Sequence, residues 1–353
     1  MISIRQLAKE IGVSPTTISL VLNSSPSAQN IPEKTKNRVR VAAKKLGYTP
    51  NPFARSLFSR RSGSVAILLS DITDPYCTTV LKGIGRSLHS SNYLPVLLDI
   101  DNSRVKFKEN LQKMVDRRIE GIIGVANSVL LQTELLTTVK NHKIPIVLIG
   151  RDMDGTDISS VSVENGEGAY LAMKHLYGLG HRAIAFIKGP EDILDSAQRW
   201  EGILKFTSQA GLTIDRKLVM PMKQPGTSSE AGFIAARELL RRKRAFTAVL
   251  AFDDITAFGA IRALTEGGKS VPVDCSVIGF DDVTIATFYN PPLTTIRQPM
   301  EALGTSAVDI FLELADSFFE GKVTSPVHRK IEPKLVVRAS TAPLAKRRPA
   351  PVG

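Results

Sequence analysis

Several charged side chains stand where they could bind a polar small molecule. Asp71, Asp253 and Asp281 each lie at the end of an apolar run, and Arg199 lies in the segment QRWEG. Carboxylates accept hydrogen bonds from hydroxyl groups, and the planar guanidinium of arginine matches vicinal hydroxyls or a carboxylate. Carboxylates together with one arginine therefore suit the recognition of a polyhydroxyl ligand, because such a ligand needs charged groups to replace water.

Each of these residues also has a structural interpretation. Asp71 or Asp74 could cap the helix that follows, which is at least as common a use of aspartate as ligand binding. Arg199 could form a surface ion pair, and Asp254 could be a carboxylate at the start of a helix. The residue types favour a binding site and leave these alternatives open.

The sequence lacks the motifs of catalysis and cofactor binding. No G-x-G-x-x-G follows the first apolar run, and neither the phosphate-binding G-x-x-x-x-G-K-[ST] nor G-x-S-x-G occurs. Two cysteines and five histidines are scattered without metal-ligand spacing. The histidines are His89, His142, His175, His181 and His328. We expect no catalytic residue, no metal and no cofactor.

Apolar runs alternate with amphipathic stretches from residue 64 onward. Strands are predicted at 64–70, 94–100, 120–126, 144–150, 183–189, 247–252 and 275–281, and helices at 78–90, 107–118, 166–179 and 229–242. Continuous apolar strands that alternate with helices are typical of parallel sheets covered on both faces. A break near 161–166 predicts two α/β subdomains. Ligands of such sheets bind beyond the carboxyl ends of the strands, where the charged residues fall.

The positive charge is concentrated at the amino terminus. The net charge is +12, and residues 1–62 hold 11 Lys and Arg against two Glu. Lys346, Arg347 and Arg348 add three charges in the tail, so the residues between are neutral in sum. A neutral body with a basic head favours a polyanionic partner at one end of the chain.

The head has the pattern of three short helices around one small core. Ser3 and Gln6 have capping-box spacing, Gly12 supplies a turn, and Ser14 can cap a second helix that starts at Pro15. A third helix is predicted at 31–46, with Val39, Ala42, Ala43 and Leu46 facing inward. The second helix presents small polar residues outward, as in a helix-turn-helix DNA reader, although a bare three-helix bundle would show the same spacing.

Two long stretches carry a specific resemblance. ISIRQLAKEIGVSPTTISLVLN and IPEKTKNRVRVAAKKLGYTPNPFARSL closely resemble the headpiece of the lactose/purine-repressor family, the LacI/GalR transcription regulators. The resemblance continues through GSVAILLSDITDPY to about residue 341. It implies a small all-α helix-turn-helix head (1–48), a hinge helix (49–62) and a two-lobed, periplasmic-binding-protein-like effector-binding and dimerisation domain (63–341). A disordered basic tail (342–353) would follow.

The resemblance also implies the residues that contact DNA. In the head these are Ser14, Pro15, Thr16, Thr17, Ser19, Leu20 and Asn23, and in the hinge Asn51, Ala54, Arg55 and Leu57. Leu57 would wedge into the minor groove and kink the operator. Leu20 departs from the polar residue of many members, and it cannot make a bidentate contact to guanine. Pro32 replaces a common capping serine, for which Asn30 with Glu33 could substitute.

By the same resemblance, an effector would lie between the lobes. The implied contacts are Asp71, Tyr76, Arg151, Arg199, Asp253, Asp281 and Gln298. Gly150 stands where several sugar-responsive members place Asp. A sugar or sugar derivative is the expected ligand, and Arg151 with Arg199 leaves a phosphorylated or acidic ligand open.

The complete interpretation is a ligand-controlled transcriptional regulator, expected to be a repressor, that binds a near-palindromic operator as a homodimer. The segment 78–89 is expected at the dimer surface, because Val80, Leu81, Ile84 and Leu88 exceed the needs of one core face. No stretch reaches the roughly 20 apolar residues of a membrane span, so we expect no membrane partner and a cytoplasmic location. The alternatives are a cytosolic sugar-binding protein and an enzyme with an appended DNA-binding head.

Overall fold

The structure is a computed structural model, and it describes residues 2–23, 26–49, 61–91, 93–100, 103–125, 144–191, 193–222 and 227–344. The chain divides into two compact units, Met1–Gly63 and Ser64–Gly353, and each is described by itself. The predicted hinge residues Asn51, Ala54, Arg55 and Leu57 lie outside the described residues, as do 345–353 of the predicted tail.

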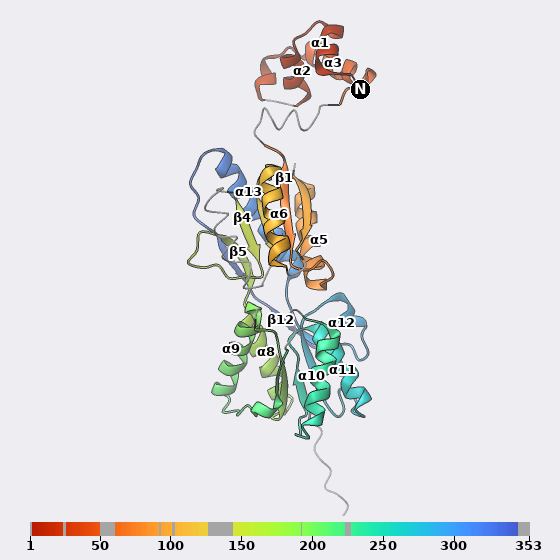
Figure 1. Cartoon of the computed structure of the whole chain (residues 1–353), viewed down its shortest axis with the longest axis vertical. Coiled ribbons are helices and arrows are strands. Elements are labelled where there is room, and N and C mark those ends of the chain that lie inside the picture. Colours follow the sequence, from red (N-terminus) through yellow and green to blue (C-terminus); the bar gives the residue numbers. More distant parts are fainter. Residues whose placement is uncertain are drawn as a thin grey trace, which may run out of the picture. The chain divides into compact units, whose positions relative to one another are not determined.

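The head consists of α1 (Ile4–Ile11), α2 (Pro15–Leu22), the short 3-10 helix η1 (Pro26–Asn30) and α3 (Glu33–Lys45) (Figure 1). The caps of α1 and α2 follow the sequence prediction. Ser3 and Gln6 form the capping box, with Ser3 N donating to Gln6 Oε1 at 2.8 Å and Gln6 N donating to Ser3 Oγ at 3.3 Å. Gly12 ends α1 at φ +64°, where a left-handed backbone favours glycine.

One small apolar cluster joins the three helices of the head. Leu7, Ile18 and Val39, one from each helix, have no exposed surface.

Two predictions about α3 are wrong. The helix begins after Pro32 without any side-chain cap, so Asn30 and Glu33 do not substitute for the serine. Leu46 is 36% exposed and does not continue the inner stripe, because the helix has already ended at Lys45.

The first lobe of the body, lobe 1, contains a six-stranded sheet in the order β11-β5-β4-β3-β1-β2, with all pairs parallel. Its strands are β1 (Ser64–Leu69), β2 (Leu94–Asp99), β3 (Ile122–Val125), β4 (Ile146–Ile149), β5 (Ser159–Val163) and β11 (His328–Ile331), and its helices are α5 (Pro75–His89), α6 (Arg104–Asp116) and α13 (Met300–Phe319). Successive residues of β1 point to opposite faces of the sheet. Ile67 packs in the cluster that includes α5 and α13, whereas Leu68 packs with α6.

The second lobe, lobe 2, contains a six-stranded sheet in the order β12-β10-β9-β8-β6-β7, in which only β12 is antiparallel. Its strands are β6 (Ile184–Lys188), β7 (Val219–Pro221), β8 (Ala248–Leu250), β9 (Ser276–Asp281), β10 (Thr294–Arg297) and β12 (Lys334–Val336). Its helical segments are α8 (Asn165–Gly178), α9 (Leu194–Gln209), η3 (Arg216–Leu218), α10 (Ser229–Arg241), α11 (Asp254–Glu266) and α12 (Thr284–Phe288). Helices α8 and α9 cover one face, and α10 and α11 cover the other.

The chain passes between the lobes three times, after β5, after β10 and after β11. The predicted break near 161–166 is confirmed, since β5 belongs to the sheet of lobe 1 and the next element, α8, belongs to lobe 2. All seven predicted strands and all four predicted helices of the body are present. Within the described ranges, none of the helices combines the length and the apolar composition of a membrane span.

Two expectations about the body are wrong. Val80, Ile84 and Leu88 are buried in the core of lobe 1, where α5 packs against α13, so they form no exposed dimer surface. The predicted tail begins too early, because residues 342–344 are fixed on lobe 2. Leu344 N donates to the carbonyl of Leu179 at 2.8 Å.

Candidate functional site

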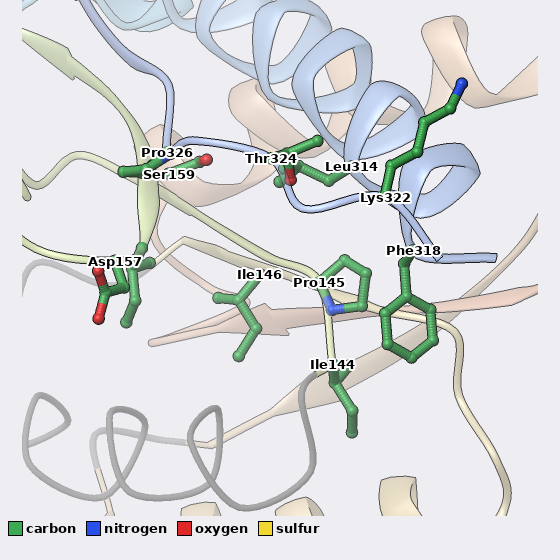
Figure 2. Close-up of a pocket in the computed structure, with 11 residues that line it drawn as sticks. Ile144, Pro145, Ile146, Asp157, Ser159, Leu314, Phe318, Lys322, Thr324 and Pro326 are labelled. Atoms are coloured by element: carbon green, nitrogen blue, oxygen red, sulfur yellow. The ribbon is translucent and has the colours of Figure 1, made fainter. Parts of the chain in front are cut away.

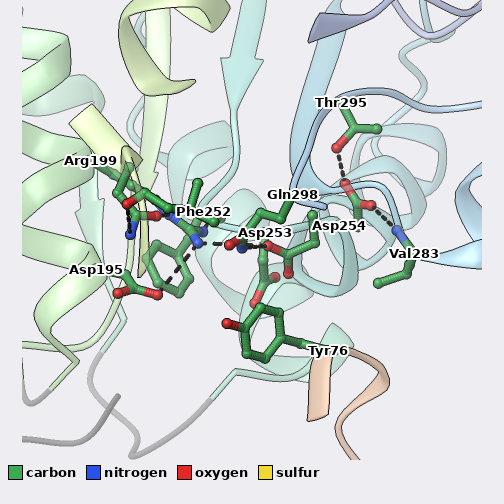
Figure 3. A network of polar contacts seen from close by, with 12 residues as sticks. Tyr76, Asp195, Arg199, Phe252, Asp253, Asp254, Val283, Thr295 and Gln298 are labelled. Carbon is green, nitrogen blue, oxygen red and sulfur yellow. Dashed lines mark hydrogen bonds and ion pairs between the residues drawn. The ribbon is translucent and has the colours of Figure 1, made fainter. Parts of the chain in front are cut away.

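A buried arginine is the centre of a polar cluster in lobe 2 (Figure 3). Arg199 lies on α9 with 6% of its surface exposed. Its Nε donates to Asn165 Oδ1 at 2.9 Å, and its Nη1 donates to the carbonyl of Phe252 at 2.7 Å. The guanidinium carbon lies 3.7 Å from the centre of the Phe280 ring, a cation–π contact. These contacts fix the orientation of the guanidinium.

Two carboxylates face the remaining nitrogen of this guanidinium. Nη2 of Arg199 lies 3.7 Å from Asp195 Oδ2 and 3.6 Å from Asp281 Oδ1. Both distances allow ionic attraction but exceed a hydrogen bond. Burial raises the pKa of Asp281 well above its usual range, although the charge of Arg199 acts in the opposite direction. Gln298 Nε2 donates to Asp281 Oδ1 at 2.6 Å, so the structure brings three predicted residues, Arg199, Asp281 and Gln298, into one cluster.

The loop that carries Asp281 has an unusual backbone held by a buried carboxyl. Asp281 has φ 117° and Asp282 has φ 60°, which are rare values for residues other than glycine. Asp254 has no exposed surface, and its Oδ2 accepts from the backbone N of Val283 at 2.9 Å. Its Oδ1 accepts from Thr295 Oγ1 at 2.5 Å. Burial raises the pKa of Asp254 to about 8, against the effect of these two hydrogen bonds.

Asp253 has the capping role that the sequence allowed for its neighbour. Asp253 Oδ1 accepts from the backbone N of Thr256 at 2.7 Å and thereby caps α11. The side chain is 5% exposed and follows β8 at the carboxyl edge of the sheet in lobe 2. Of two adjacent aspartates, the first therefore caps α11, and the second has no exposed surface.

Two predicted contacts, Asp71 and Tyr76, and the predicted capping residue Asp74 follow β1 at its carboxyl end, in the DITDPY segment. Asp71 accepts from Thr73 N at 2.7 Å, and Asp74 caps α5 by accepting from Tyr76 N at 2.8 Å. Burial raises the pKa of Asp74 to about 6, and the nearby charges of Asp253 and Asp71 act in the same direction.

Tyr76 is 9% exposed and appears in the same close-up as Asp253 (Figure 3). Burial raises the pKa of Tyr76 well above its usual range, with added contributions from Asp195 and Asp281. Asp74 and Tyr76 of lobe 1 therefore lie within electrostatic range of the carboxylates of lobe 2. The sequence predicted both possible uses of this loop: ligand contacts by Asp71 and Tyr76, and capping of the following helix by Asp71 or Asp74.

Arg151 follows β4 in lobe 1 and is 5% exposed. Burial lowers its pKa. No acceptor among the described residues lies within hydrogen-bond distance of its Nε. This nitrogen is therefore a buried donor that a ligand could satisfy. The described contacts of the Arg199 cluster do not include Arg151.

Sequence reasoning missed two members of the Arg199 cluster. Asp195 lies one helical turn before Arg199, and this i,i+4 spacing was an available signal. Asn165 begins α8, and only the fold brings it to Arg199. A separate surface pocket of about 290 Å³ lies in lobe 1 between the starts of β4 and β5 and the end of α13, and it includes none of the predicted residues (Figure 2).

The predicted DNA-contacting residues of the head lie on and around α2. Ser14 caps this helix by accepting from Thr17 N at 3.0 Å, with Pro15 at its first position. Thr16 is exposed and Leu20 is half-buried. Ser19 Oγ accepts from Asn23 Nδ2 at 3.2 Å at the end of the helix. α2 thus presents Thr16 on a helix whose two ends are fixed by Ser14 and Asn23.

Comparison with known proteins agrees with both units. Residues 3–51 match the model of bacterial regulatory proteins of the lacI family, and residues 173–341 match a periplasmic binding protein-like domain. The HTH-type transcriptional repressor PurR of Pectobacterium carotovorum is 34% identical over 344 residues, which is 97% of each chain. The chain belongs to the lacI family. It is a DNA-binding transcriptional repressor controlled by a small effector.

Solved structures of this family have the same fold. The lac repressor dimer bound to operator and the anti-inducer ONPF is 26% identical, with 97% of this chain and 99% of that chain covered and a TM-score of 0.83. The regulator CelR in complex with cellobiose is 28% identical, with 96% and 100% covered and a TM-score of 0.72. Proteins of the lacI family bind operator DNA as dimers and respond to small molecules.

Proposed function

We propose that this lacI-family repressor senses a neutral sugar or sugar derivative through the Arg199 cluster. The observation that carries the proposal is the position of Arg199 Nη2 between Asp195 and Asp281, at 3.7 and 3.6 Å. A ligand hydroxyl can accept from the guanidinium and donate to either carboxylate, so it replaces two long ionic contacts with two hydrogen bonds. Gln298, Asp253, Asp71, Tyr76 and Arg151 complete the proposed site.

The balance of charge favours a neutral ligand over an acidic one. Asp195 and Asp281 lie near the buried Arg199, and the charge of Asp253 acts on both Asp281 and Asp74. An anionic ligand would add to the burial and the like charges that already raise the pKa values of Asp281 and Asp74, so its binding is disfavoured. Two relatives of known structure were solved with cellobiose and with ribose, and these ligands have the expected chemistry.

A thermal-shift titration tests the ligand class. The probes are cellobiose, ribose and other neutral sugars, glucose 6-phosphate, and free nucleobases. At least one neutral sugar should raise the Tm of the wild type, and the shift should be lost in Arg199→Lys, which keeps the charge but lacks the planar fork. The matched control is Arg262→Lys, at an exposed arginine of lobe 2. Shifts with only the phosphate or a nucleobase, or a sugar shift that persists in Arg199→Lys, would overturn the proposal.

We propose further that α2 reads the operator through Thr16, Thr17, Ser19 and Leu20, with Ser14, Pro15 and Asn23 setting the ends of the helix. Threonine hydroxyls can bond base edges or phosphates, and methyl groups can contact thymine. The hinge residues Asn51, Ala54, Arg55 and Leu57 enter this proposal from the family resemblance alone. Selection of binders from random duplexes should return an inverted repeat whose half-sites are about one helical turn apart or closer.

We propose that the homodimer forms through β2 and α12. Leu94 and Leu97 of β2 are 66% and 41% exposed, and Phe288 of α12 is 77% exposed. Strand β2 is the last strand of its sheet, so its outer edge and its apolar side chains are open to a second copy.

Sedimentation velocity of Leu94→Glu/Leu97→Glu tests this interface. The variant should be monomeric at concentrations where the wild type is a dimer, because two buried carboxylates would be desolvated in the interface. Leu204→Glu, at a leucine of α9 that is 45% exposed, is the control and should remain dimeric. A dimeric double variant would exclude β2 from the interface.

A further inference from the structure

A second concentration of positive charge lies in lobe 2. Three loops precede β6, β7 and β8, and these strands are neighbours in the order β7-β6-β8. In a parallel sheet the loops that enter adjacent strands lie at one edge. These loops, with the last turn of α10, carry seven cationic side chains against the carboxylates of Asp215 and Glu238. We name this set the basic edge: Arg182, Arg216, Lys217, Arg241, Arg242, Lys243 and Arg244.

Three arginines of the basic edge have structural roles. Arg182 Nη1 donates to the carbonyl of Tyr177 at 2.8 Å, near the end of α8, and its guanidinium stacks on the Tyr177 ring at 3.4 Å. Arg242 Nη1 donates to the carbonyl of Lys217 at 2.9 Å. Arg244 makes two hydrogen bonds to Asp215 Oδ2, at 2.7 and 3.0 Å. Folding alone explains why these arginines are present.

The other four cations have no comparable role in the fold. Arg216, Lys217 and Lys243 are exposed and make no ion pair with any described residue, and Arg241 reaches Glu238 only at 4.0 Å. Lys243 also has φ 52°, a left-handed conformation that glycine would adopt at lower cost. Crowded like charges oppose folding. The protein therefore maintains a positive surface that its own stability does not require.

The body has a net charge of zero, but its positive and negative side chains are not evenly distributed. Lysines and arginines equal the acidic residues between 63 and 345, so an excess of cations at one edge requires an excess of carboxylates elsewhere. Carboxylates surround Arg199 beyond the opposite, carboxyl ends of the strands. Such a dipolar arrangement produces a field that attracts a polyanion to the basic edge.

We propose that the basic edge is a second, sequence-independent contact surface for duplex DNA, in addition to the head. Its cations are distributed over three loops, as suits a linear array of phosphates, whereas a single small anion needs converging donors. A pocket of about 360 Å³ does lie between Arg182 and Arg244, but Asp215 already neutralises Arg244 there. Arg182 already stacks on the ring of Tyr177, so this ring is not available for the base stacking typical of single-stranded nucleic acid.

The test measures the salt dependence of binding by the full-length protein to a random-sequence duplex of about 40 base pairs. The variant Arg241→Glu/Lys243→Glu changes two exposed side chains that make no close contact in the fold. The plot of log K against log salt concentration should lose about 2 units of slope, since each phosphate contact contributes roughly 0.9. Affinity at about 0.1 M salt should fall by about tenfold or more.

A charge-matched control separates contact from net charge. Lys174→Glu/Lys205→Glu makes the same change at exposed positions of α8 and α9 in the same lobe, and its slope should equal that of the wild type. An unchanged slope in Arg241→Glu/Lys243→Glu, or an equal loss in the control, would overturn the proposal. Arg216→Gln/Lys217→Gln provides a second, milder variant, with an expected loss in the same direction if the first pair fails to fold.

Discussion

The two oxygens of Asp254 connect three segments that are distant in the sequence. Asp254 begins α11, accepts from Thr295 in β10, and accepts from the backbone of Val283 after β9. The residues just before Val283 include Asp281, whose left-handed backbone directs its carboxyl toward Arg199. Asp254 is thus a positioning residue: it holds the loop that carries one of the proposed ligand contacts.

The hydroxyl of Thr295 should be important for the stability of lobe 2. Thr295→Val keeps the shape of the side chain but removes the donor at 2.5 Å from Asp254 Oδ1. A buried acceptor without a partner costs about 1–3 kcal/mol, so the free energy of unfolding by urea should fall by about that amount. Thr295→Ser keeps the hydroxyl and is the control, with a smaller loss. Equal losses in the two variants would show that the hydroxyl contributes nothing.

The sequence predicted the chemistry of the cluster better than its geometry. Arg199, Asp281 and Gln298 were identified, and the structure brings them together. Nothing in the pair Asp253–Asp254 indicates which carboxyl caps the helix and which is internal, because adjacent helix-start residues differ only in what the fold places beside them. Asn165 could not be predicted either, since its contact with Arg199 depends on the packing of α8 against α9.

At the scale of elements, helices in the body pack closely at paired glycines. Gly83 of α5 faces α13, and a Cβ there would collide with the backbone of Glu301; Gly304 of α13 faces α5, with Val80 as the obstacle. The α10–α11 pair repeats this arrangement with Gly232 and Gly259. These helices can therefore approach until their backbones touch, which explains the burial of α5 against α13 that the sequence did not reveal.

Substitution at one of these glycines should separate two helices. Gly304→Ala places a methyl group against the backbone of α5, and overpacking of this kind costs about 1–3 kcal/mol of unfolding free energy. Gly85→Ala is the control, because it lies on the exposed side of α5 with open space around it. The control should stabilise the protein by about 0.5–1 kcal/mol through helix propensity. Denaturant titrations with the same sign for both variants would contradict the close-contact interpretation.

The strands that the sequence missed share a physical property. β5 (SSVSV), β10 (TTIR) and β11 (HRKI) are polar or charged, and β7 and β12 have three residues each. All seven predicted strands were continuous apolar runs, which buried parallel strands favour. The missed strands are stabilised by pairing with a neighbour already in place, so local composition carried no signal.

At the scale of the whole body, three chain crossings connect two sheets that each end in carboxylates. Asp74 of lobe 1 is within electrostatic range of Asp253 of lobe 2, and the resulting repulsion adds to the burial that raises the pKa of Asp74 to about 6. A proposed ligand rich in hydroxyl donors would lie between such groups and reduce the repulsion. Without it, protonation of Asp74 has the same effect.

The stability of the body should therefore depend on the ionisation of Asp74. Its pKa in the folded protein, about 6, is above the ordinary value of 3.8, so the folded state binds more protons than the unfolded state between these limits. The free energy of unfolding should fall as the pH rises from about 4 to 6 and change little above that on account of this group.

Asp74→Asn removes the charge and keeps a good helix cap for α5. Urea titrations at several pH values should show the variant gaining stability relative to the wild type as the pH rises, with the difference vanishing near pH 4. Because Asp254 remains in both proteins, its own dependence over a wider range cancels in this difference. Parallel pH profiles for the two proteins would contradict the argument that like charges from the two lobes oppose each other.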